Sequence, residues 1–178
     1  GPQVADFARP CRDNGVPDPV SFAYPGGHHD RRAVRLLTRL GYRFARRLAD
    51  PESPLIDPGG RGLAYDPRRH HPLLVPSTLW VGENTNLDDL KWAVRQARDG
   101  KVAVLTFHGV PDRYPHCSIS REDFDEHMQY LADQECRVIA LRDVARYVDA
   151  DQYTADPYES IFAGLGVAPL DLRCETLV

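Results

Sequence analysis

The sequence predicts an α/β fold in which short parallel strands alternate with amphipathic helices. The run at residues 102–107 is apolar, rich in β-branched side chains and too short for a helix. Residues 20–47 have the pattern of a strand, a helix and a second strand, a unit whose strands are parallel. The segments 84–100 and 120–131 carry apolar residues at helical spacing.

Composition limits the size and the class of the protein. A chain of 178 residues with 42% hydrophobic residues can bury one ordinary core, so one domain is expected. The net charge of −4 argues against a nucleic-acid partner, and no apolar run is long enough to cross a membrane. The four cysteines form no CxxC pair, which excludes a zinc knuckle.

The first half of the chain begins with a strand at 20–24, which ends at Pro25-Gly26-Gly27 because these residues do not continue a ladder. A helix follows, with Asp30 in its first turn and Gly41 at its end. Residues 42–47 then form the second predicted strand.

The middle of the chain starts with residues 50–72, whose many prolines and glycines predict a long loop without regular elements. Residues 73–81 predict a third strand that Pro76 breaks, which indicates a bulge or an edge position. The helix that follows is capped within 84–86 and ends at Gly100.

The last elements follow the strand at 102–107. Ser120 and Asp123 have the spacing of a helix cap, and residues 137–140 and 141–148 predict a short strand and a final helix. This order gives about five strands, too few to close an eight-stranded barrel, so either the sheet is open or strands are missing. Residues 150–178 predict a tail along the outside.

His108 is the main candidate for chemistry because it is the first polar side chain after the strand at 102–107. The carboxyl ends of parallel strands face the ligand crevice of such sheets, and Asp112 follows on the same loop. The alternative is a structural histidine that bonds a neighbouring carbonyl.

Three other polar groups have simpler explanations. His28-His29-Asp30 could suggest a metal cluster, but adjacent residues point in different directions, so a polar helix N-terminus is favoured. His70-His71 lies in the proline-rich loop, where surface polarity is the safer interpretation. Cys117 beside His116 leaves a thiol nucleophile as a weaker alternative.

Four segments together resemble the C-terminal half of a polysaccharide deacetylase of the NodB-homology type, carbohydrate esterase family 4. They are FAYPGG at 22–27, LGYRFARR at 40–47, VLTFHGVPD at 104–112 and VIALRDVARYV at 138–148. The resemblance covers about residues 16–149 and implies a distorted, incomplete (β/α) barrel with outer helices. On this basis residues 1–149 are the C-terminal portion of such a domain, and 150–178 are its tail.

The family removes acetyl groups from glycans with a divalent metal, often zinc, and parts of its machinery have no counterpart here. No segment resembles the TFDDG-like motif of the catalytic base or the HxxxH metal motif, so no residue of this chain is assigned to metal. The RxPYG-like motif corresponds to residues 23–27, where Ala23 and Gly26 replace its Arg and Tyr. The isolated chain is therefore expected to be inactive, and the divalent metal is expected in the full-length parent.

The matching motif at residues 105–108 implies that His108 is the general acid that protonates the departing amine. The partner implied is an acetylated polysaccharide, with substrate contacts at Tyr24, Pro25, Gly26, Trp80 and Leu105. A non-catalytic glycan-binding or structural module of the same fold is the alternative. An exposed sheet edge also leaves a homodimer open.

Overall fold

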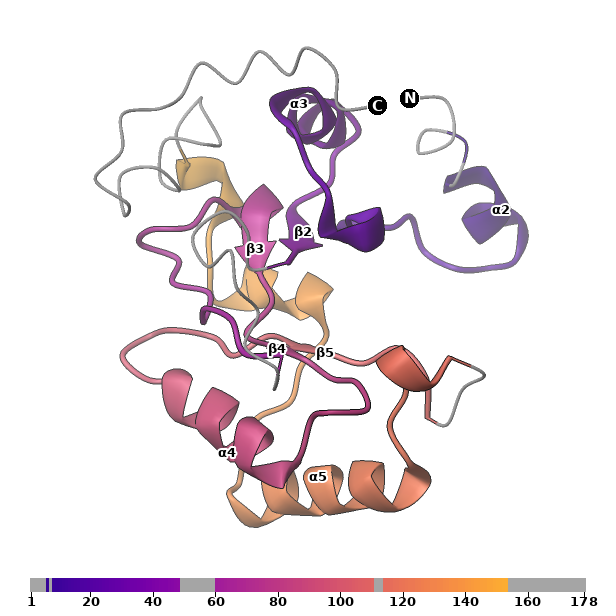
Figure 1. Cartoon of the computed structure of the whole chain (residues 1–178). Coiled ribbons are helices and arrows are strands. Elements are labelled where there is room, and N and C mark those ends of the chain that lie inside the picture. Colours follow the sequence, from indigo (N-terminus) through magenta and orange to yellow (C-terminus); the bar gives the residue numbers. More distant parts are fainter. Residues whose placement is uncertain (1–5, 7, 49–59, 111–113, 154–178) are drawn as a thin grey trace.

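The computed structural model describes residues 6, 8–48, 60–110 and 114–153, so the predicted Asp112 and the tail beyond Tyr153 lie outside the described residues. Helices and short parallel strands alternate within these ranges, and the described strands form no closed barrel. Figure 1 shows two groups of elements, one around β2, β3 and α3 and the other around β4, β5, α4 and α5. No described helix is long and apolar enough to span a membrane.

The first sheet contains β1 (Ser21–Ala23), β2 (Phe44–Arg47) and β3 (Val75–Pro76), all parallel and in that order. Helix α3 (Arg31–Arg39) connects β1 to β2, which confirms the predicted strand-helix-strand unit. Asp30 is the cap of α3, and its carboxylate accepts a hydrogen bond from the Ala33 N–H at 2.6 Å.

The second sheet contains β4 (Leu79–Trp80) and β5 (Leu105–Thr106), also parallel. The predicted break at Pro76 is confirmed, because the third strand is divided into β3 and β4. Ser77 lies at the division and connects the two sheets: its hydroxyl donates to the Arg47 carbonyl at 2.9 Å and lies 3.2 Å from the Thr106 hydroxyl. Strand β3 is the last strand of the first described sheet, beside β2, which agrees with the predicted edge position.

The described part of the predicted long loop, residues 60–71, contains no helix or strand, as expected, but it forms isolated bridges with other segments. Arg61 forms an antiparallel bridge with Leu79, and Tyr65 forms one with Val102. The Trp80 N–H also donates to the Gly60 carbonyl at 2.9 Å. This segment therefore occupies the side of β4 opposite β5.

Helices α4 (Leu87–Gln96) and α5 (Arg121–Asp133) lie side by side beneath β4 and β5 (Figure 1). The predicted caps are confirmed, since Asn86 is the N-cap of α4 and Ser120 is the N-cap of α5. Helix α4 ends before the predicted Gly100, because Ala97 leaves the helical conformation. The two helices and the second sheet share one core, formed by Leu79, Val81, Leu90, Ala93, Ile119 and Leu131.

The predicted strand at 137–140 is absent from the described structure, and the predicted helix at 141–148 is a shorter 3-10 helix, η4 (Leu141–Arg146). Val138 is 69% exposed, so an apolar run here does not mean a buried strand. Ile139 and Val144 instead pack against Phe44 and Tyr65. Strand β5 consequently stays at the edge of its described sheet.

Strand β2 separates two further cores because its neighbouring side chains point to opposite faces. Ala45 packs with the α3 residues Val34 and Leu37, whereas Phe44 packs with Tyr65 and Val144. The remaining helical turns are α2 (Ala8–Asp13), η1 (Pro25–Gly27), η2 (Pro72–Leu74), η3 (Pro115–Cys117) and η5 (Ala150–Gln152).

Candidate functional site

The candidate site is formed by Trp80 and His108, at the carboxyl ends of β4 and β5. The two strands are parallel neighbours, so both side chains reach the same edge of the second sheet. Their ring centroids lie 5.7 Å apart with an interplanar angle of 70°, an edge-to-face contact. His108 is exposed and Trp80 is half-buried, which leaves the imidazole accessible beside an aromatic surface.

The turn η3 approaches Gly82, two residues after Trp80. A Cβ atom at Gly82 would lie 2.5 Å from the His116 carbonyl oxygen and 3.1 Å from the Trp80 ring. A residue larger than glycine would therefore force η3 away from the indole. Gly109, directly after His108, is anchored to Ile119, whose N–H donates to the Gly109 carbonyl at 3.1 Å.

The residues just before His108 are packed into the protein and anchor the backbone that leads to it. Thr106 is buried beside Ser77, and the Phe107 ring makes an edge-to-face contact with Phe124 at 5.4 Å. Leu105, a predicted substrate contact, is half-buried and packs against the core beneath the second sheet. The backbone around His108 is thus anchored while the imidazole itself stays free to meet a ligand.

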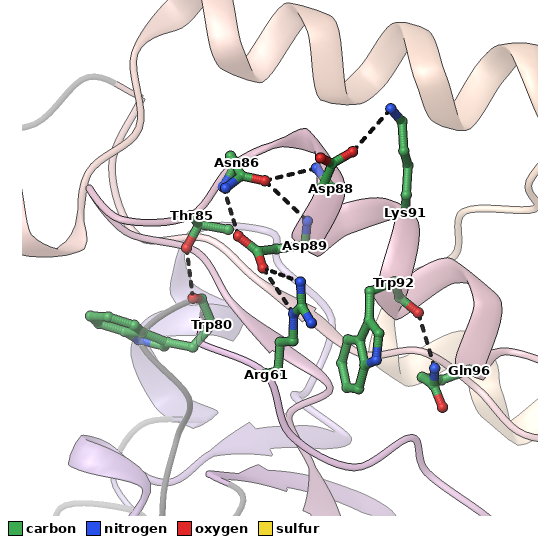
Figure 2. A network of polar contacts seen from close by, with 9 residues as sticks. All are labelled: Arg61, Trp80, Thr85, Asn86, Asp88, Asp89, Lys91, Trp92 and Gln96. Atoms are coloured by element: carbon green, nitrogen blue, oxygen red, sulfur yellow. Dashed lines mark hydrogen bonds and ion pairs between the residues drawn. The ribbon is translucent and has the colours of Figure 1, made fainter.

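The polar network in Figure 2 connects helix α4 to the segment that pairs with Trp80. Asp89 accepts hydrogen bonds from the Arg61 guanidinium at 2.8 Å and from the Asn86 N–H at 3.0 Å. The Arg61 guanidinium also lies 5.2 Å from the centre of the Trp92 ring. This network binds the segment after residue 59 to α4, and that segment in turn pairs with Trp80.

The turn at Tyr24, Pro25 and Gly26 lies at the end of β1, in the first sheet. Tyr24 is only 3% exposed, and its hydroxyl donates to the Leu73 carbonyl at 3.0 Å. Burial raises the pKa of this hydroxyl well above its usual value. Pro25 and Gly26 are exposed. No contact described in the structure joins this turn to Trp80 or His108, so the predicted substrate residues fall into two separate groups.

The remaining candidates have structural contacts. Asp30 caps α3, in agreement with a polar helix N-terminus. The Cys117 thiol donates to the Tyr114 carbonyl at 3.5 Å, and the His116 ring packs on Tyr114 at 6.2 Å. No group of three or more histidine, cysteine or acidic side chains in the described residues has the geometry of a metal site.

The prediction that His70 belongs to a polar surface is wrong, because this side chain is buried. Its exposed fraction is 7%, and its Nδ1 accepts a hydrogen bond from the Asp66 N–H at 2.9 Å. Burial lowers the pKa of His70 to about 4, so the ring is neutral at pH 7. Nothing in the proline-rich segment indicated this buried position.

Two clefts lie in the described residues away from this site. One, of about 650 Å³, is bounded by α3, η2 and η5, and a second, of about 460 Å³, lies beside Tyr147 and Tyr153. Neither is lined by Trp80 or His108. The candidate site is therefore separate from both of these clefts.

Comparison with known protein families, curated proteins and solved structures finds no match to this chain.

Proposed function

We propose that this chain is the C-terminal part of a metal-dependent polysaccharide deacetylase and that His108 is its general acid. The observation that carries the proposal is the exposed imidazole at the end of a parallel strand, held edge-to-face against Trp80. The resemblance of residues 105–108 to the last motif of the family supports the same assignment.

The chemistry requires a proton donor because an amine leaves poorly from the carbonyl carbon of an amide. A histidine titrates near neutral pH, so an accessible imidazolium can give its Nε2 or Nδ1 proton to the departing nitrogen. The half-buried Trp80 ring beside it would contact the apolar face of a sugar and bring the leaving nitrogen toward His108. Both steps use only residues of this chain.

The described residues do not fit a divalent metal, because they contain no cluster of suitable ligands. The metal and the catalytic base would come from polypeptide beyond this chain. The function proposed here for the 178 residues is accordingly proton donation and substrate contact.

The test uses the full-length parent and measures acetate release from an N-acetylated chito-oligosaccharide. His108→Ala should lower kcat by about 100-fold to 10,000-fold and leave the bound metal unchanged. His116→Ala is the matched control, because it removes an exposed imidazole on the adjacent turn and should keep full turnover. Undiminished turnover of His108→Ala would disprove the assignment.

The second candidate is a non-catalytic glycan-binding module. It is favoured by the accessible aromatic surface of Trp80 and by Ala23, which stands where the family carries an arginine. The chain has two tryptophans, so Trp92→Phe makes Trp80 the sole tryptophan reporter. Saturable quenching by the oligosaccharide, without acetate release from the parent, would favour this candidate over the enzyme.

We propose a second copy of the chain as a further partner, paired along β1. This strand is an edge of the described sheet, and the Tyr24 N–H bonds to β2, so the backbone groups of Ser21 and Ala23 point away from β2. Such unpaired groups can accept another strand. Ala23→Pro should convert a dimer to a monomer in light scattering, whereas Ala23→Ser should not. A wild-type protein that is monomeric at every concentration would contradict this pairing.

A further inference from the structure

His127 lies in the middle of α5 with its imidazole enclosed in the core beneath the second sheet. The residue is 1% exposed, and both ring nitrogens are buried without a hydrogen-bond partner in the described structure. Buried polar groups are nearly always paired, because an unpaired one loses its hydrogen bonds to water without replacement. A histidine in this position therefore needs an explanation beyond packing.

The immediate surroundings of the ring are apolar. The Phe107 ring lies 6.5 Å away in an edge-to-face arrangement, and Phe124 and Leu131 belong to the same side of α5. A neutral imidazole can occupy such a space, but an imidazolium cannot be solvated there. Burial accordingly lowers the pKa of His127 below its usual value.

Three carboxylates are near enough to act on the ring electrostatically, and none forms a hydrogen bond with it. Asp123 and Glu126 lie on α5 itself, where both are exposed and Asp123 accepts from the Ser120 hydroxyl at 2.7 Å. Asp89 lies on α4, and Arg61 holds it in an ion pair. Their charges favour the protonated ring, but burial outweighs them.

We propose that protonation of His127 releases the layer formed by α4 and α5 from the second sheet. When the ring takes up a proton it must leave the core to reach water, and α5 then separates from Phe107 and β5. The open state binds the proton more tightly than the closed state. The population of the open state should therefore grow as the pH falls below about 6.5, by up to about tenfold per pH unit.

The consequence reaches the candidate site because Phe107 directly precedes His108. Loosening of α5 would remove the support beneath Phe107 and free the strand end that carries His108 and contacts Trp80. This inference does not rest on the proposed function, since it concerns the packing of α5 alone.

The test is amide hydrogen exchange of the whole chain at pH 7 and pH 5, corrected for the intrinsic effect of pH. Exchange in residues 121–133 should accelerate at the lower pH, by up to about 30-fold, and His127→Leu should reduce the acceleration. His116→Leu is the control and should behave as the wild type. Equal acceleration in His127→Leu, or none in the wild type, would overturn the proposal.

A second measurement needs no substitution. The carbon and proton shifts of the His127 ring should report the neutral form for as long as α5 is protected from exchange. They should change to the charged form only together with the loss of that protection. A ring that becomes charged while α5 stays protected would also overturn the proposal.

Discussion

The guanidinium of Arg61 and the carboxylate of Asp89 lie 2.8 Å apart, joining a glycine-rich segment to the first turn of α4. The Asp89 side chain is 6% exposed, and it also accepts from the Asn86 N–H as part of a capping box. Asp89→Ala should lower the free energy of unfolding by about 2–3 kcal/mol, because it removes a cap and leaves Arg61 unpaired. Urea denaturation measures this loss.

Asp88→Ala is the matched control for that prediction. Asp88 is in the same turn and pairs with Lys91 at 3.2 Å, but its side chain is 83% exposed. An exposed pair of this kind contributes little, so the loss should be within about 1 kcal/mol. Equal losses for the two variants would mean that the contact with Arg61 does not stabilise the fold.

Gly60→Ala should destabilise the protein far more than Gly100→Ala. Both residues have positive φ, 70° and 78°, and for alanine this conformation costs about 1–2 kcal/mol. A Cβ at Gly60 would in addition lie 2.1 Å from the Trp80 carbonyl oxygen, whereas one at Gly100 meets open space. The difference in unfolding free energy should reach at least about 2 kcal/mol. Similar losses would show that the segment can move away from β4.

His70 should make the stability depend on pH. Its pKa of about 4 lies below the unfolded value, so the unfolded chain binds more protons between about pH 6.5 and 4. Stability is therefore complete above this interval and is lost as the pH falls through it, by up to roughly 3 kcal/mol. His70→Asn should reduce this slope in urea titrations at several pH values, and the exposed control His116→Asn should keep it. An unchanged slope in His70→Asn would contradict the role of His70.

Tyr24→Phe should cost stability without affecting a ligand at the candidate site. The hydroxyl donates to the Leu73 carbonyl inside the core, so its removal should lower the free energy of unfolding by about 1–2 kcal/mol. The affinity of an acetylated oligosaccharide, followed by Trp80 fluorescence in the Trp92→Phe background, should not change. A loss of affinity at unchanged stability would instead make Tyr24 a substrate contact.

The sequence could predict features that depend on neighbouring residues. The caps at Asn86 and Ser120 are set by one side chain and the next turn of helix, and Pro76 disrupts a ladder wherever it occurs. The exposed position of His108 follows from the end of an apolar strand, a pattern that is also local.

Features that depend on distant partners could not be predicted in this way. Arg61 and Tyr65 gain their pairing only because β4 and Val102 lie beside them in the fold. The run at 137–140 has the composition of a strand, yet no described strand lies next to it. The sequence gives a weak indication that His127 is buried. It follows Phe124 by three residues and precedes Leu131 by four, which is the spacing of the buried side of the helix.

In the hydrogen bond between Ser77 and Thr106, only the Thr106 hydroxyl can be the donor. This limits the hydrogen-bond donors that the end of β5 can present to a ligand. The Ser77 hydroxyl has one hydrogen, which it gives to the Arg47 carbonyl, so the Thr106 hydroxyl must point its own hydrogen at Ser77. Thr106 therefore has no hydrogen left for a molecule arriving at the end of β5. Of Thr106 and His108, only His108, two residues beyond the end of β5, can supply one.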